Sequence, residues 1–200
     1  MDDTGDFELN TQIENPYNRS RDRGNVYSVP RHQWENQFIY DLPFGHNVLV
    51  RGWQVNGVLN MSSGNWLNPQ FSGVDTSNTN TIGGRPDIVA PITYPGTVNG
   101  WFSTSSFAVP ANGTFGNAAR NSIQGPGWIL ANAGLSRTFK LERFGAIQLG
   151  ATFQNILNHE NLGEPNLVIN NVNGGKITST AIFPPAGSPR TGQLLLRWSF

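Results

Sequence analysis

Hydrophobic and polar residues alternate along five stretches of the chain, most clearly in residues 191–200, which read TGQLLLRWSF. Successive side chains of a β-strand point to opposite faces, so residues two apart share a face. The apolar residues that share one face are Leu194, Leu196, Trp198 and Phe200. The other face is polar except for Leu195. The pattern predicts a two-faced strand, and on this stretch alone an edge strand of a soluble sandwich fits equally well.

The same period predicts strands near 32–42, 48–62, 128–139 and 146–157, with the fifth over 192–200. The alternation near 48–62 is longer than the roughly five or six residues of an ordinary strand, and it suits a tilted membrane strand. Residues expected on the apolar, lipid-facing side are Phe38, Tyr40, Trp53, Val55, Leu59, Leu135, Ile147, Leu149, Phe153, Leu194 and Leu196. Residues expected to line a wet lumen are Gln54, Asn56, Gln148, Thr152 and Gln154.

The connections between the predicted strands alternate between short and long. Residues 1–30 form a loop, and residues 63–127 and 158–189 form long loops rich in Gly, Asn and Pro. Loops longer than about 12–15 residues are uncommon in compact soluble domains. Outer-membrane barrels have long extracellular loops and short periplasmic turns. We therefore predict an all-β, antiparallel up-and-down meander of about five long strands, an incomplete segment of a large transmembrane barrel.

Composition excludes several classes of protein. The chain is 37% hydrophobic and 13% charged, against roughly 45–50% and a quarter in average globular domains. A formal net charge of zero gives no electrostatic reason to expect nucleic acid as a partner. The absence of cysteine excludes disulfides and thiolate metal sites. The first ten residues, MDDTGDFELN, do not form a signal peptide, so a membrane protein of this kind is expected to be a piece of a longer chain.

No catalytic motif is found in the sequence. His32, His46 and His159 lie far apart without the spacing of metal ligands, and we expect structural or solvent-exposed roles for them. Catalytic triad order, HExxH, the P-loop and GxGxxG are all missing. A glycoside hydrolase needs a close pair of carboxylates, which the spacing of Asp and Glu does not provide. We expect no catalytic residue, no metal and no cofactor, and hence a protein that is not an enzyme.

Candidate ligand contacts lie in the connection 63–127. Arg85 and Asp87 of GRPD are close enough to pair, and a pair that fixes the loop is favoured over a ligand contact. Trp101 and Phe102 are expected to pack the loop together, but they are the first place to look for ligand contacts. Other aromatic residues fit either an aromatic girdle at the membrane interfaces or carbohydrate stacking, and the girdle is favoured: Trp34, Tyr40, Trp53, Trp66, Trp128, Trp198 and Phe200.

Six stretches in order resemble the C-terminal barrel segment of TonB-dependent outer-membrane receptors, especially the Oar-like branch that carries a carboxypeptidase-regulatory-like domain. They are VPRHQWENQFIYDLPFG (29–45), GWQVNGVLNMSSGNW (52–66), GRPDIV (84–89), WFSTSSFAVPANGTFGNAARNSIQGPG (101–127), FQNILNHENLGEPN (153–166) and the terminal RWSF. No single stretch is specific, and the ordered set carries the resemblance.

The resemblance implies a barrel of about 22 strands with a plugged lumen, in the bacterial outer membrane. Outer-membrane lipid is then a partner, and the strand that carries Trp198 and Phe200 is the signal read by the barrel assembly machinery. Other partners are the remaining barrel strands and the plug, with the TonB complex acting only through the missing plug. The implied function is uptake of a bulky nutrient, siderophore or oligosaccharide. The alternative is a soluble or surface β-sandwich module for carbohydrate binding or adhesion.

Overall fold

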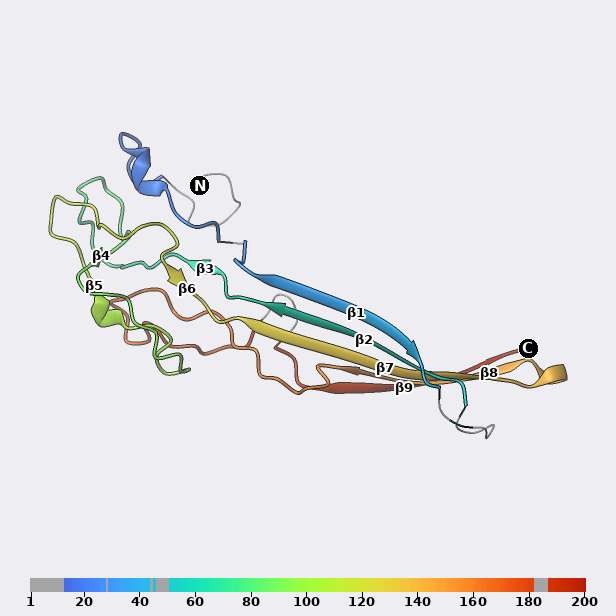
Figure 1. Cartoon of the computed structure of the whole chain (residues 1–200). Helices are drawn as coiled ribbons and strands as arrows, with labels where there is room; N and C mark the ends of the chain where they lie inside the picture. Colours follow the sequence, from blue (N-terminus) through green and yellow to red (C-terminus); the bar gives the residue numbers. More distant parts are fainter. Residues whose placement is uncertain (1–12, 28, 44, 46–50, 182–186) are drawn as a thin grey trace. The chain divides into compact units, whose positions relative to one another are not determined.

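The computed structural model describes residues 13–27, 29–43, 45, 51–181 and 187–200. Its main sheet has five antiparallel strands in the order β1-β2-β7-β8-β9 (Figure 1). The strands are β1 (Gln33–Asp41), β2 (Trp53–Ser62), β7 (Trp128–Lys140), β8 (Ala146–Gln154) and β9 (Thr191–Ser199). The sheet is not closed, because β1 and β9 each have one strand neighbour. This architecture confirms the predicted antiparallel meander.

The register of the sheet separates its apolar and polar side chains. Directly opposite residues of antiparallel strands point to the same face. One row across the sheet joins Tyr40 to Val55, Val55 to Leu135, Leu135 to Ala151 and Ala151 to Leu194. The rows on either side of it on this face are also mostly apolar, and we call this side of the sheet the apolar face. Its two polar members are Asn36 and Arg137.

Positive φ angles set two strand ends that alternation did not predict. β2 begins at Trp53 rather than near residue 48, after Gly52 at φ 83°; residues 48–50 lie outside the described part. β8 ends at Gln154 rather than at 157, because Asn155 takes φ 46°. The left-handed region breaks an extended strand, and Gly and Asn enter it at the lowest cost.

The chain divides into two compact units, and the long connections are far more ordered than the sequence indicated. Unit 2 comprises residues 32–62, 128–161 and 181–200, and unit 1 comprises 1–31, 63–127 and 162–180. Unit 1 contains two short ladders, each with two strands. They pair β3 (Trp66–Leu67) with β6 (Ile123–Gln124) and β4 (Asp87–Ile88) with β5 (Phe107–Ala108). The 3₁₀ turns are η1 (Arg19–Asp22), η2 (Thr104–Ser106) and η3 (Glu142–Phe144).

A small hydrophobic core holds unit 1 together. Leu67, Phe102, Phe107 and Ile123 are buried against one another, and the rings of Phe102 and Phe107 meet edge to face at 6.0 Å. Leu67 and Ile123 are neighbours in the β3–β6 ladder, so the ladder brings residues far apart in sequence into this core.

Unit 2 has no comparable core. Among its described residues, the buried hydrophobic side chain is Ala131. The described part of unit 2 holds the main sheet as a single layer, so it does not show the two packed sheets of the sandwich alternative. The described residues also contain no helix with the length and apolar character to span a membrane.

Candidate functional site: an apolar sheet face and a polar cavity

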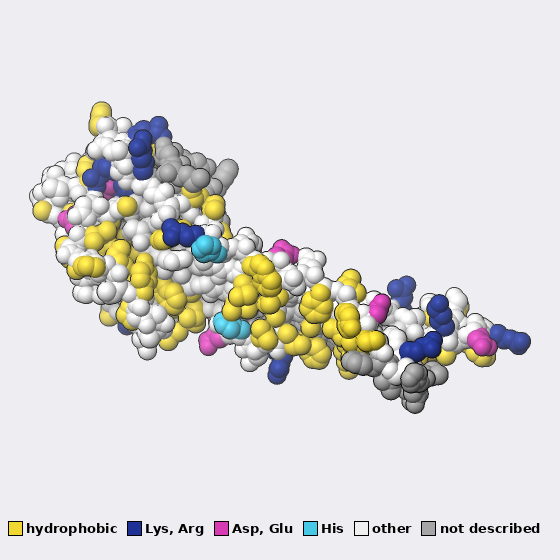
Figure 2. All heavy atoms as spheres, viewed as in Figure 1, with side chains coloured by type: hydrophobic (Ala, Val, Ile, Leu, Met, Phe, Trp, Pro, Cys, Tyr) yellow, Lys and Arg dark blue, Asp and Glu magenta, His cyan; other side chains and the backbone are white. Residues whose placement is uncertain are grey.

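The eleven residues expected to face lipid all lie on the apolar face of the main sheet. Several are strongly exposed: Leu194 is 89% exposed, Leu196 72% and Tyr40 56%. Figure 2 shows hydrophobic side chains gathered over the strands. A contiguous apolar surface of this kind marks a site of interaction with another apolar phase. That this phase is lipid remains a prediction at this point.

Arg137 is the charged exception on the apolar face, and aromatic rings cover it. Its guanidinium lies 4.1 Å from the ring centroid of Phe139 and 6.0 Å from that of Trp53, and the side chain is 7% exposed. Arg137 stands in the row next to the one that holds Trp198. Arginine on a lipid face costs roughly 2–4 kcal/mol at the midplane and roughly 0–1 near an interface. This position near the turns, with two aromatic neighbours, is therefore compatible with a membrane face.

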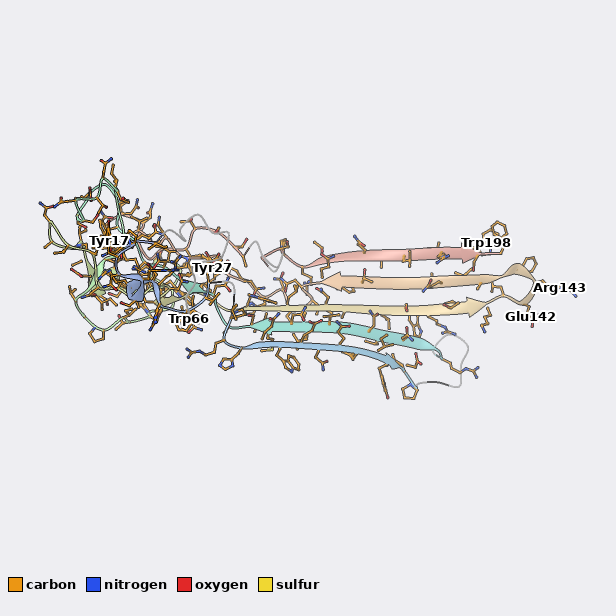
Figure 3. All side chains as sticks on the ribbon, turned by 90° about the horizontal axis from the view of Figure 1, so that it is seen from above. Tyr17, Tyr27, Trp66, Glu142, Arg143 and Trp198 are labelled. Carbon is orange, nitrogen blue, oxygen red and sulfur yellow. The ribbon has the colours of Figure 1, made fainter. Side chains whose placement is uncertain are left out.

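The two residues expected to form the C-terminal girdle and assembly signal lie together. The ring centroids of Trp198 and Phe200 are 5.6 Å apart. The indole nitrogen of Trp198 donates to the carbonyl oxygen of Phe144 at 2.9 Å. Figure 3 shows Trp198 at the same end of the sheet as Glu142 and Arg143 of the β7–β8 turn. The sheet end that carries the short turns is therefore also the end of β9.

The opposite face of the sheet is mainly polar, as the alternation predicts. Gln54 donates to the carboxylate of Asp41 on the neighbouring strand at 2.9 Å. Gln148 and Thr152 of β8 lie opposite Arg197 and Gln193 of β9. Water can hydrogen-bond to the exposed polar groups of this face, while the side-chain oxygen of Asn60 is buried without a hydrogen-bond partner among the described residues.

The four candidate ligand contacts separate in the structure. Phe102 is 2% exposed in the core, and the indole of partly buried Trp101 donates to the carbonyl oxygen of Gln124. These two residues pack the connection together, as favoured from the sequence. Asp87 accepts a hydrogen bond from the backbone nitrogen of Asn117 at 2.8 Å. The expected pair of Arg85 and Asp87 is wrong, because Arg85 forms its ion pairs with Glu14 and Asp22 instead.

Arg85 lines a cavity of about 320 Å³ within unit 1. Its lining comes from three separate segments of the chain, residues 13–22, 68–85 and 115–120. Pockets that hold small ligands have volumes of roughly 300–1,000 Å³, so this cavity lies at the small end of that range. We call it the loop cavity.

Buried charges form one side of the loop cavity. Arg85 contacts Glu14 at 2.7 Å and Asp22 at 3.2 Å, and Arg120 lies 3.9 Å from Asp22. Arg85, Asp22 and Arg120 are each 5% exposed or less. Arg21 reaches Glu14 at 3.4 Å and also donates to the carbonyl oxygen of Gly116. Buried charges persist in proteins when they are paired, and these pairs join the three segments.

Sequence reasoning missed most of this cluster. Charges alternate within residues 15–25, a pattern typical of a solvated loop, whereas Asp22 is 1% exposed. The sequence signal was the arginine of GRPD, which marked Arg85 but not its partners. Glu14 and Asp22 are separated from Arg85 by more than sixty residues, and no local pattern connects positions at that distance.

Asp75 organises a turn in one of the segments that line the loop cavity. Its carboxylate accepts hydrogen bonds from the backbone nitrogen and hydroxyl of Ser77 and from the backbone nitrogen of Asn80. Partial desolvation raises the pKa of Asp75, but the hydrogen bonds from Ser77 and the backbone outweigh it and lower the pKa below its ordinary value.

The described residues include no group of three or more His, Asp or Glu side chains placed to hold a metal ion. His159 contacts Asn161, with 3.2 Å between its Nδ1 and the amide oxygen. His32 precedes β1, and His46 lies outside the described residues.

The chain was compared with family models, curated proteins and solved structures. A family model described as an outer membrane beta barrel domain matches residues 1–193. No curated protein and no solved structure matches the chain. The matched range contains β1, β2, β7 and β8 and reaches the first residues of β9.

Proposed function

The chain belongs to the outer membrane beta barrel domain family, and we propose that its sheet is a wall segment of a larger receptor barrel that imports a bulky nutrient with energy from the TonB complex. Localisation in the outer membrane follows from the family. The receptor class, the energy coupling and the nutrient are the proposed part.

The observation that carries the proposal is the two-faced, single-layered sheet. Its apolar face is exposed along β1 and β9, and its strands satisfy their backbone groups by pairing with one another. Lipid offers no hydrogen-bond partners, so strands can cross it only when each is paired on both sides within a closed barrel. The open edges of β1 and β9 would therefore pair with further strands of the same barrel.

Support for the TonB-dependent class comes from the ordered stretches of sequence that resemble such receptors, from residue 29 to the terminal RWSF. The alternation of short turns and long connections fits this class too. Unit 1, built from the long connections, is large enough to contact a ligand outside the membrane. The nutrient would pass along the polar face of the sheet.

Single-cysteine variants test which face meets lipid, and since these 200 residues contain no cysteine, the introduced thiol is the one labelled within them. Leu149→Cys and Leu194→Cys lie on the apolar face, and their direct sequence neighbours Gln148→Cys and Gln193→Cys lie on the polar face. In outer-membrane vesicles we expect a water-soluble maleimide to label the two former glutamine positions at least tenfold faster. Lipid excludes the reagent from the apolar face.

Equal labelling at all four positions, or faster labelling of the two former leucine positions, would contradict the wall-segment proposal. Denaturing the vesicles in detergent and urea provides the control, because all four cysteines must then react alike.

Energy coupling is tested by uptake in cells that make the intact receptor. Labelled maltohexaose and ferrichrome serve as one probe for each ligand class. We expect uptake of one of them to disappear both when the gene is deleted and when a protonophore removes the proton gradient. Uptake that depends on the gene but survives the protonophore would exclude a TonB-dependent mechanism.

A further inference from the structure

We propose that the loop cavity binds a neutral, polyhydroxylated ligand the size of a mono- or disaccharide unit. The inference deepens the proposed uptake function by naming the chemical class of a ligand outside the membrane. It is carried by the charges, unfilled hydrogen-bonding atoms and rim side chains of unit 1.

The first step is the charge balance of the cavity. Two arginines, Arg85 and Arg120, and two carboxylates, Glu14 and Asp22, are the charged residues that line it. The charges of these four lining residues cancel, and Arg21, which lies outside the lining, shares Glu14 with Arg85. An anionic ligand would lie against the two carboxylates, and a cationic ligand against the two arginines. Either ion would lose its hydration without a net opposite charge to replace it.

The second step is the set of buried polar atoms that lack a partner. Both carboxylate oxygens of Asp22 and the Nε of Arg85 accept or donate no hydrogen bond among the described residues. The ion pair between the two side chains places Asp22 Oδ1 3.2 Å from Arg85 Nη1. Hydrogen-bonding positions of both side chains stay unfilled. Buried polar atoms are almost always hydrogen-bonded, so unfilled ones next to a cavity indicate a partner that is not part of the chain.

A hydroxyl group meets both needs. It donates one hydrogen bond and accepts others, so one hydroxyl can donate to Asp22 and another can accept from Arg85. A ligand with several hydroxyls on a small ring presents both at once. Water can fill the same valences, but it gains nothing from the apolar part of the wall.

The third step is the rim of the cavity, by which we mean its more exposed lining residues, and it combines polar side chains with an aromatic one. Thr79 and Thr81 are exposed, and Asn68 and Gln70 add amide groups. Phe115 is half-buried in the lining, and the guanidinium of Arg21 lies 5.4 Å from its ring centroid. Hydroxyl and amide groups at fixed positions give orientation, while an aromatic ring contacts the C–H face of a sugar. Pockets for small ligands commonly combine these features.

The test is calorimetric titration of the full chain refolded in detergent micelles. The neutral probes are glucose, galactose, maltose and lactose, and the charged counterparts are glucose 6-phosphate and glucosamine. We expect saturable binding of at least one neutral probe, with at least tenfold weaker binding of the charged counterparts. If no neutral probe binds, or if a charged counterpart binds as tightly as its neutral form, the inference is wrong.

Variants locate the binding. Phe115→Ala removes the aromatic contact and Thr81→Val removes one hydroxyl of the rim, and each is expected to weaken binding at least tenfold. Phe144→Ala and Thr180→Val are matched controls, because neither residue lines the cavity. Asp22→Asn is a further variant, but it removes a buried negative charge that contacts both Arg85 and Arg120, and it can unfold the unit. Near-ultraviolet circular dichroism checks the fold of each variant, and unchanged affinity in both folded rim variants would overturn the assignment.

The outcomes separate this inference from the proposed function. Energised uptake without saccharide binding in the cavity would reject the inference and leave the receptor proposal standing. The opposite outcome has two parts: the rim variants lose saccharide binding, and uptake is unchanged by the protonophore. It would reject the receptor proposal and leave the cavity assignment standing.

Discussion

At the scale of single residues, Asn155 shows how one side chain ends a strand. It is 2% exposed, its backbone nitrogen donates to Asn132, and its amide nitrogen donates to the carbonyl oxygens of His159 and Ser188. Its amide oxygen accepts from the backbone nitrogen of His159 at 3.0 Å. With φ at 46°, it joins the end of β8 to the segment before β9.

Asn155→Ala is expected to lower the free energy of unfolding by about 3 kcal/mol. The change removes three side-chain hydrogen bonds, each worth about 1 kcal/mol, and leaves buried backbone groups without partners. Urea unfolding of the chain in detergent micelles measures the loss. Asn158→Ala is the matched control, because Asn158 also has a positive φ but accepts one hydrogen bond, from Arg190, and is exposed. Equal losses in the two variants would contradict the assigned role.

The ends of the strands were the part of the fold that sequence could not supply. The strand was predicted to run to residue 157, although the alternation stops at Gln154 because Asn155 is polar where the period requires an apolar residue. The period does not show that Asn155 takes a left-handed conformation. The period also did not mark Gly52, where a turn ends and β2 begins one residue later. Period-two patterning reports which face a residue occupies, whereas a strand end depends on contacts that form only in the folded chain.

At the scale of elements, the turn of residues 75–80 joins local hydrogen bonding to the wall of the loop cavity. Thr76, Ser77 and Thr79 line the cavity, and the carboxylate of Asp75 holds this turn in shape. The lowered pKa of Asp75 means that the ionised carboxylate is more stable in the folded chain than in the unfolded one. The stability of the turn therefore depends on pH.

The sign of the linkage follows from the lowered pKa. The contribution of Asp75 is fully present above its ordinary pKa of about 3.9 and is lost as the pH falls through the lowered value. We expect a carboxyl titration, followed by carbon NMR, to give a midpoint below 3.9. The amide of Asn80 should lose protection from hydrogen exchange over the same interval, and Asp75→Asn should remove this pH dependence. A titration midpoint of Asp75 at or above its ordinary pKa would refute this prediction.

The short ladders of unit 1 lay beyond sequence reasoning for a different reason. β3, β4, β5 and β6 are two residues long, and so short a strand leaves no period to detect. Trp101 and Phe102 were correctly expected to pack the connection, because large aromatic side chains bury well whatever the local backbone does. The contacts of Arg85 with Glu14 and Asp22 join segments far apart in the sequence and could not be read from spacing.

At the scale of the whole molecule, the sheet depends on an apolar surrounding. Unit 2 buries little of its own hydrophobic surface among the described residues, and its apolar side chains along β9 are exposed. Burial of such surface stabilises by roughly 25 cal/mol per Å². Water alone cannot supply this term, so we expect the fold of unit 2 to need lipid or detergent.

Removal of detergent from the refolded chain is therefore expected to cause aggregation through the apolar face and the open edges of β1 and β9. Sedimentation before and after dilution below the critical micelle concentration measures this, with circular dichroism to follow the β signal. Transfer into lipid nanodiscs is the control that should keep the chain dispersed. A monodisperse, folded chain in plain buffer would argue against a membrane-embedded sheet.

Unit 1 draws its parts from widely separated places in the chain. Tyr27 donates to Glu164, 137 positions away, and Gln70 bridges to Val168. Segment 162–180 lies between β8 and β9, so unit 1 includes part of the connection that joins the last two strands of the sheet. Contacts this distant form late and slowly. A chain whose insertion stops part-way would therefore lack a complete unit 1. Any ligand that unit 1 binds would then be bound only by fully assembled proteins.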